Sequence, residues 1–319
     1  MYEDNCTYIP LPDLFTHYAG LTDSQYALLV IGAILVTAVL ALGTVHLMYV
    51  WKYVSDERIR SKLYILALLF PMIVALSIIS MVSPRSSPLL TSVGLLYIQY
   101  SMYTAISLNR IILGGYERFS SMLNDEKVMM NFQVPPCCCC MPCLPKPAPS
   151  AQKLNIMECL SLQGTIVRVI IVIINCHLVS EFPEQTQHLL LVTELAGILS
   201  LLFTLFGSHA IGKITGPYVQ QYRSIILFRF TDISLALFTA QLPLIFDLIF
   251  VKYGVITSGP VQTALGNAKY LNSFVLICEA FLLSILASLL MTPKKSALFD
   301  KYPQRLDLSS PREKILPKQ

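Results

Sequence analysis

The feature of this sequence that most limits how it can fold is a series of long apolar stretches. The first, Tyr26–Val50, runs for 25 residues without a charge, enough for a helix to cross about 30 Å of hydrocarbon. Charged residues make up only 13% of the chain, against about 25% in soluble domains. The sequence therefore predicts an all-α membrane protein with seven transmembrane helices. The predicted spans are Tyr26–Val50, Leu63–Val82, Leu89–Leu108, Cys159–Val179, His188–Ser208, Ser224–Phe250 and Tyr270–Met291.

The distribution of Lys and Arg predicts how these spans are oriented. Seven spans place the two termini on opposite sides of the membrane. If the N-terminus is outside, eighteen of the 23 Lys and Arg residues lie in inside segments, three lie outside and two lie within spans. Because cytoplasmic loops carry the excess of basic residues, we expect the N-terminus outside and the C-terminus in the cytosol. The predicted parts are an extracellular segment 1–25, a transmembrane domain 26–291 with a cytosolic cysteine-rich connector 109–158, and a disordered cytosolic tail 292–319.

Five of the nine cysteines lie within seven positions of this connector, between prolines. A reducing cytosol disfavours disulfides there. Cys140 and Cys143 form a CxxC pair, but a closed zinc site needs a second pair or a histidine, so zinc stays an alternative, as does no modification at all. S-acylation needs only accessible cysteines close to the bilayer, and it is the favoured interpretation. The predicted acylation sites are Cys137, Cys138, Cys139, Cys140 and Cys143.

The N-terminal segment contains Asn5-Cys6-Thr7, which fits the acceptor pattern for N-glycosylation. Since the predicted orientation places Asn5 outside the cell, this residue is a predicted glycosylation site.

Charged residues inside the predicted spans are candidates for function, because each costs several kcal/mol in hydrocarbon unless it is paired or hydrated. Arg168, Arg229 and Asp232 are expected in the cytosolic half of the membrane, and Glu194 and Glu279 nearer the outer surface. These groups either hold helices together or line a polar path for an anion; the mixture of signs leaves both open. The candidate substrate-binding residues are Arg168, Arg229, Asp232, Glu194, Glu279, Asn272 and Tyr100.

The connector also carries a resemblance. The block Pro-Pro-Cys-Cys-Cys-Cys-Met-Pro-Cys at 135–143, between the third and fourth of seven spans, resembles the alpha subunit of the organic solute transporter family. Weaker agreements in the same order are Pro84-Arg85-Ser86, Gly114-Gly115 and Glu279-Ala280-Phe281-Leu282. Met141 and Leu144 interrupt a cysteine run that is denser in vertebrate members, which bears on the number of acyl chains.

The resemblance implies facilitated movement of amphipathic organic anions, such as bile acids and conjugated steroids, across the plasma membrane. It also implies a single-span beta subunit as partner, and no cofactor. Besides the plasma membrane we expect an endomembrane pool, and an oligomer is possible for such a chain; nothing points to nucleic acid. The chain has no Walker A pattern, no catalytic motif of an intramembrane enzyme, and no Asn-Pro-x-x-Tyr of a G-protein-coupled receptor. A non-transporting membrane-organising or trafficking factor remains the alternative function.

Overall fold

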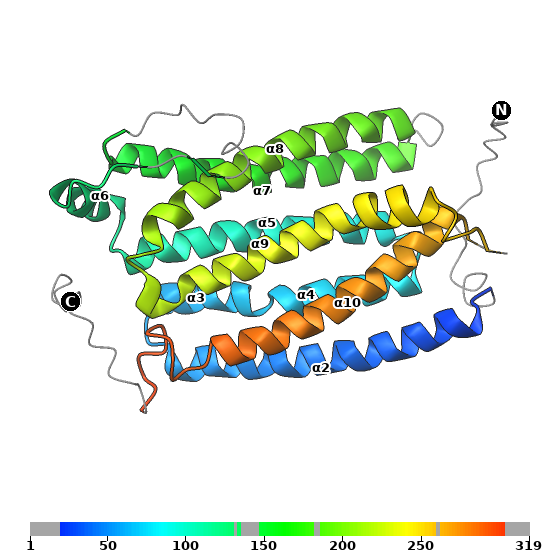
Figure 1. Cartoon of the computed structure of the whole chain (residues 1–319), viewed down its shortest axis with the longest axis horizontal. Helices are drawn as coiled ribbons and strands as arrows, with labels where there is room; N and C mark the ends of the chain where they lie inside the picture. Colours follow the sequence, from blue (N-terminus) through cyan, green and yellow to red (C-terminus); the bar gives the residue numbers. More distant parts are fainter. Residues whose placement is uncertain (1–19, 131–132, 135–146, 182–185, 260–261, 304–319) are drawn as a thin grey trace.

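The computed structural model describes residues 20–130, 133–134, 147–181, 186–259 and 262–303, and every regular element in these ranges is a helix. The long helices lie side by side along the longest axis of the molecule (Figure 1). The short helix α6 marks one end of the bundle, called here the α6 end; α2 and α10 begin at the opposite end. The elements are α2 (Asp23–Tyr53), α3 (Glu57–Ala67), α4 (Leu69–Val82), α5 (Ser87–Ile112), α6 (Tyr116–Asp125), α7 (Ala151–Glu181), α8 (Thr186–Thr215), η1 (Gln220–Tyr222), α9 (Ser224–Gln241), η2 (Leu242–Val251) and α10 (Ala264–Leu290).

Six helical stretches are long and apolar enough to cross a membrane, and they correspond to six of the seven predicted spans. The third predicted span is helical as part of α5 but is not among the six. The helix α5 lies inside the bundle, where 12 of its 26 residues are buried, and polar side chains at membrane depth face the bundle interior. The prediction of an all-helical, multi-pass protein is confirmed. The third predicted span lies in α5, an internal helix of mixed polarity. The six stretches are Asp23–Tyr53, Glu57–Val82, Ala151–Leu178, Leu189–Thr215, Ser224–Val251 and Ala264–Leu290.

Local signals in the sequence explain where several helices begin and end. The Thr22 hydroxyl accepts a hydrogen bond from the Gln25 amide, while the Gln25 side chain accepts one from the Thr22 amide, a capping box that starts α2. Asp56 caps α3 in a similar way, accepting from the Arg58 amide at 2.8 Å. Gly114 and Gly115 separate α5 from α6 with φ of 74° and 96°, values that favour glycine.

The second span is interrupted at Leu68, which separates α3 from α4. Pro71 lies three residues later and has no amide hydrogen to donate to the carbonyl one turn before it, which accounts for a break in the helix here. The Tyr97 hydroxyl of α5 donates to the nearby carbonyl of Ile65 at 2.8 Å. Gly43 of α2 faces Pro71 so closely that a Cβ there would lie 2.5 Å from the proline ring.

Helix α5 occupies the middle of the bundle, between α3 and α4 on one side and α7 and α9 on others, while α2 and α10 pack with α4. Helices α7 and α8 share the most extensive contact between any two helices of the described residues. Gly164 of α7 and Gly207 of α8 each face the other helix at a distance that leaves no room for a side chain. Small residues at such positions let membrane helices approach closely.

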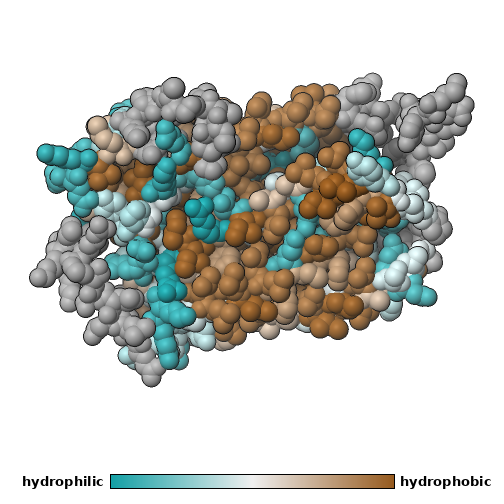
Figure 2. Space-filling model, in the orientation of Figure 1, coloured by the Kyte–Doolittle hydropathy of each residue, from teal (hydrophilic) through white to brown (hydrophobic). Residues whose placement is uncertain are grey.

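The outer surface of the bundle is apolar in its middle part. Figure 2 shows hydrophobic residues over the middle of one face and hydrophilic residues gathered mainly toward the α6 end. Helices α7 and α8 expose many large apolar side chains, as expected for surfaces in contact with lipid. These are Ile166, Val169, Ile170, Ile173 and Ile174 on α7, and Leu189, Leu191, Val192, Leu195, Ile198, Leu199, Leu202 and Phe203 on α8.

The chain after α10 packs against the α6 end of the bundle from Thr292 to Pro303. The Ala297 amide donates to the Gln221 carbonyl at 3.1 Å, and the Lys301 amide donates to the Tyr53 carbonyl at 3.2 Å. The side chain of Phe299 is buried. The first part of the tail that we predicted to be disordered is therefore folded; residues 304–319 lie outside the described part of the chain.

Candidate functional site

Helices α7 and α8 are joined by polar side chains along most of their length. Each pair consists of one residue from each helix, so the two helices are held in a fixed register in an apolar environment where such contacts have no competing water. The pairs are Ser161 with Ser208 at 2.7 Å, Gln163 with Ser200 at 2.7 Å, Arg168 with Glu194 at 3.5 Å and Asn175 with Thr193 at 2.7 Å.

Arg168 and Glu194 form the only oppositely charged pair in this series. The side chain of Arg168 is 7% exposed and that of Glu194 49% exposed. Gly197 supplies the room for the guanidinium, since a Cβ there would lie 3.2 Å from the Arg168 Nη1. We expected the two charges at different depths, but they meet across the interface between α7 and α8. Helix α7 begins at Ala151 rather than Cys159. The helix therefore continues past the predicted span on the α6 side, and Arg168 lies near its middle.

Arg229 and Asp232 contact each other on α9, as their spacing of three residues predicts. The Arg229 Nη1 lies 3.5 Å from the Asp232 Oδ2. Asp232 has a second partner that the sequence did not suggest, since the His209 Nε2 of α8 lies 3.4 Å from its Oδ1. Arg229 is mostly exposed and also lies over the ring of Phe228. This group links α8 to α9.

Glu279, near the middle of α10, meets Gln241, the last residue of α9. The Gln241 amide donates to the Glu279 Oε1 at 2.7 Å. Immediately after Gln241 the chain continues as the π-helical segment η2, which contains Pro243, and π-helical turns occur frequently at functional sites. Glu279 lies 15 residues from the start of α10 and 11 from its end, so it is deeper in the bundle than its predicted position near the outer surface.

Several buried polar atoms near α5, α9 and α10 have no hydrogen-bond partner among the described residues. They include the Glu279 Oε2, the Gln241 Oε1, the Asn272 Oδ1 and the Gln99 Oε1. Buried polar groups are nearly always hydrogen-bonded, so we expect each of these unpaired atoms to contact water, an ion or a ligand. This part of the interior is thus polar enough to accommodate a hydrated or polar group.

Tyr100 lies on α5 beside Tyr103, with ring centroids 6.4 Å apart. Sequence reasoning overlooked what lies next to this pair. Arg110, in the last turn of α5, forms an ion pair with Glu158 of α7 at 3.1 Å. Glu158 was counted as the last residue of a polar connector; only the early start of α7 places it in a helix. The signal available in the sequence was its position directly before an apolar stretch.

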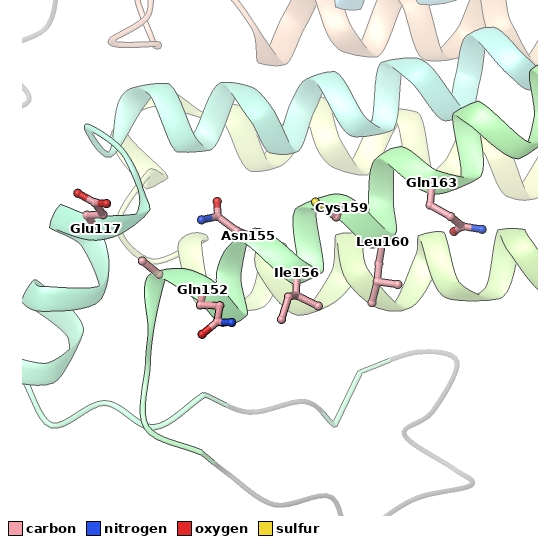
Figure 3. A pocket seen from close by; sticks show the side chains of 8 residues that line it. Glu117, Gln152, Asn155, Ile156, Cys159, Leu160 and Gln163 are labelled. Carbon is pink, nitrogen blue, oxygen red and sulfur yellow. The ribbon is translucent and has the colours of Figure 1, made fainter.

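Two hollows lie near the α6 end, and neither is lined by a predicted candidate residue. One is a shallow groove of about 600 Å³ along the first turns of α7, closed at one end by Glu117 of α6 (Figure 3). The other is a small apolar cavity of about 60 Å³ beside the break at Leu68, lined among others by His46, Phe70 and Phe299. The His46 Nε2 lies 2.8 Å from the Ser288 hydroxyl.

The structure brings the predicted candidates together in separate places: Arg168 with Glu194, Arg229 with Asp232, and Glu279 in the helix that also carries the buried Asn272. The predicted acylation sites and Asn5 lie outside the described residues. Within the described ranges, no group of three or more His, Cys, Asp and Glu side chains is placed to hold a metal ion.

Comparison with known proteins gives a consistent family. A family model described as organic solute transporter Ostalpha matches residues 28–295. The Caenorhabditis elegans organic solute transporter alpha-like protein 3 is 36% identical over 298 residues, which cover 93% of this chain and 85% of that protein. Alpha-like protein 2 of the same organism is 27% identical over 315 residues, 98% of this chain and 92% of that protein. No solved structure matches the chain. The chain therefore belongs to the organic solute transporter alpha family, a family of transporters and not of enzymes.

Proposed function

We propose that this chain is the alpha-type subunit of a facilitative transporter for amphipathic organic anions, such as steroid or bile-acid conjugates. The observation that supports this most directly is the buried Arg168, a guanidinium held between two lipid-exposed helices of a protein in a solute transporter family. A buried cation at membrane depth has to be compensated by a carboxylate, water or a bound anion. Glu194 provides this compensation between transport events, and the anionic group of the solute replaces it during passage.

The remaining candidates have supporting roles in this proposal. Asp232 has two partners, Arg229 and His209, and acts mainly as a link between α8 and α9. Glu279 and Asn272 each have a buried oxygen without a hydrogen-bond partner among the described residues. In this proposal they keep the middle of the bundle hydrated while a solute passes. Tyr100 offers an aromatic surface to the apolar body of the solute.

The proposed orientation has the α6 end in the cytosol and the opposite end outside the cell. Helices α2, α8 and α10 end at the α6 end (Figure 1), and the basic residues Lys52, Lys213 and Lys295 follow or lie in these ends. The opposite end carries few basic residues. In this orientation the five cysteines at 137–143 lie in the cytosol, where we propose that they are S-acylated, and Asn5 lies outside, where we propose glycosylation.

The proposed assembly is a heteromeric complex with a single-span beta-type subunit in the plasma membrane, with an endomembrane pool. The names of the relatives, which call each an alpha-like protein, support a partner of another type. The lipid-exposed apolar surfaces of α7 and α8 offer area for a single helix, and for a second copy of the chain in an oligomer.

Uptake of a labelled steroid conjugate tests the proposal in cells expressing the chain with and without a candidate single-span partner. We expect Arg168→Ala to abolish uptake while the amount of protein at the surface stays normal. Arg229→Ala should have a smaller effect on uptake, because Arg229 is mostly exposed and Asp232 keeps His209 as a partner. Normal uptake by Arg168→Ala would show that the solute takes another route, and attention would move to Glu279 and Asn272.

Absence of uptake by the wild-type chain at the cell surface, with every partner tested, would favour the alternative role in membrane organisation or trafficking. Surface biotinylation in the same cells separates loss of transport from loss of the protein.

A further inference from the structure

A compact charged cluster lies at the α6 end of the bundle (Figure 1), formed by side chains of α5 and α7 with neighbours on α3 and α6. Its centre is the ion pair between Arg110 and Glu158 at 3.1 Å. The Glu158 side chain is 6% exposed and that of Arg110 is 41% exposed. The carboxylate is thus fixed inside the protein, while the guanidinium is still accessible from outside.

A second cation approaches the same cluster from α3. The Lys62 Nζ lies 5.6 Å from the centre of the Tyr103 ring, a cation–π contact, and its charge interacts with those of Arg110 and Glu158. Two cations therefore share one carboxylate. The cluster has an excess positive charge, and Lys62 has no carboxylate of its own within it.

Tyr116 lies beside both charges of this ion pair. The guanidinium of Arg110 lies 6.0 Å from the ring centre of Tyr116. Burial, and next the charge of Glu158, raise the pKa of the Tyr116 phenol, so its hydroxyl keeps its proton at neutral pH. The Tyr116 hydroxyl and the Glu158 carboxylate are both buried and lie close enough to interact with each other, so Tyr116 helps to hold Glu158 inside the protein.

An aromatic surface leads away from the cations along α5. Tyr103 contacts Lys62, and Tyr100, one turn nearer the middle of the helix, contacts Tyr103 with ring centroids 6.4 Å apart. Tyr97, a further turn away, is tied to α3 through the Ile65 carbonyl. Both Tyr100 and Tyr103 are partly exposed. A cationic end and an aromatic stripe on one helix match a molecule with one anionic end and a flat apolar body.

We infer that Lys62 and Arg110 bind the anionic end of an amphipathic solute at the α6 end of the bundle, with the solute body against Tyr103 and Tyr100. Glu158 acts as an exchangeable internal counter-ion: it holds Arg110 when no solute is bound and releases it when a solute carboxylate or sulfate arrives. This inference rests on the proposed transport function and assigns it a second, more accessible anion site than Arg168.

The alternative interpretation is that the ion pair between Arg110 and Glu158 only holds the two ends of the connector 109–158 together, since the two residues lie at these ends. The two readings differ in the effect of Glu158→Gln. As a counter-ion, Glu158 competes with the solute, so removal of its charge strengthens solute binding. As a purely structural partner, its loss weakens binding together with stability, in the same direction as loss of Arg110.

Binding of a fluorescent steroid sulfate to the full-length protein in phosphatidylcholine nanodiscs distinguishes them. We expect Lys62→Gln and Arg110→Gln to raise the Kd of the steroid sulfate about fivefold or more. Arg110→Lys should raise it less. Glu158→Gln should lower the Kd several-fold. Lys52→Gln is the matched control, because Lys52 also lies over a tyrosine ring, that of Tyr53 at 5.4 Å, but belongs to another part of this end. An uncharged steroid should bind all variants equally. Thermal unfolding of each variant identifies those that do not fold, and Arg110→Lys keeps the charge if Arg110→Gln fails.

Each outcome counts for or against the site. Unchanged binding by Lys62→Gln and Glu158→Gln, with a wild-type protein that binds the sulfate, would overturn this site alone. A wild-type protein that binds no anionic steroid would overturn the site and the proposed function together. If phosphatidylserine in the discs abolishes sulfate binding to the wild type and not to Lys62→Gln, the cluster is a site for acidic lipid and the inference is wrong.

Discussion

Gly164 shows how strictly single residues determine the contact between α7 and α8. A Cβ at this position would lie 1.9 Å from the Thr204 Oγ1, far inside normal contact. The Thr204 hydroxyl is itself fixed, because it donates to the Ser200 carbonyl at 3.0 Å. Neither a methyl group added at position 164 nor the Thr204 side chain could move away cheaply, so the glycine sets the distance between the two helices and with it the distance between Arg168 and Glu194.

Gly164→Ala is therefore expected to destabilise the protein, by about 1–3 kcal/mol as for other overpacked sites. Thermal unfolding in detergent or nanodiscs measures the effect. Gly32→Ala is the control, since a Cβ at Gly32 would make only ordinary contacts of 3.6 Å or more. The double variant Gly164→Ala, Thr204→Ala should recover part of the loss; an unaffected melting temperature in Gly164→Ala alone would contradict the close approach seen here.

At the residue level the sequence predicted which charges lie within the long apolar helices but not most of their partners. Arg229 and Asp232 could be paired from spacing alone, because residues three apart share a helix face. The partners Glu194 for Arg168 and His209 for Asp232 come from other helices. Such a pairing depends on how each helix is rotated and shifted along its axis, which hydropathy does not report.

At the scale of the elements, the sequence located the helices well and their extents less well. Apolar residues mark the part of a helix in hydrocarbon, so polar first turns such as 151–158 of α7 were assigned to a connector. The break at Leu68 has a signal in the sequence, because Pro71 lies three residues after it. The ten-residue π-helical segment η2 had no comparable signal, because Pro243 is equally compatible with an ordinary kink.

The segment after α10 provides an element-scale prediction. Its contacts include the Ser296 hydroxyl, which donates to the Tyr222 carbonyl at 2.7 Å, and the Asp300 carboxylate, which accepts from the Ser55 amide at 3.0 Å. Phe299 fills one side of the apolar cavity near the break at Leu68. Truncation after Lys295 should lower the melting temperature by several degrees, because it exposes this cavity and removes the link between two loops.

Truncation after Pro303 is the matched control and should leave the melting temperature unchanged, because it keeps every contact just described. Phe299→Ala within the full chain should reproduce part of the loss, as expected for a buried aromatic side chain. Equal stability of the two truncated proteins would show that the segment does not hold the α6 end together.

At the scale of the whole molecule, a central polar helix is surrounded by apolar ones. Helix α5 is the one predicted span that is not apolar enough to count as a membrane helix by itself, yet it contacts α3, α4, α7, α8 and α9. Its neighbours shield its polar residues from lipid. Helices α7 and α9, which carry several candidate polar groups, both pack against this internal helix, and we propose that the solute path follows its surroundings.

The orientation of this bundle is the last prediction, and the acylation and glycosylation proposals depend on it. The excess of Lys and Arg at the α6 end predicts that this end faces the cytosol. Epitope tags placed at the N-terminus and within 180–187 should be labelled on intact cells, whereas tags at Lys146 and Gln319 should be labelled only after permeabilisation. A tag at 180–187 with normal surface expression serves as the internal positive control for access. Labelling of the Lys146 tag on intact cells would place the cysteine-rich block outside, where acylation by cytosolic-facing enzymes is excluded and disulfides become the expected chemistry of its cysteines.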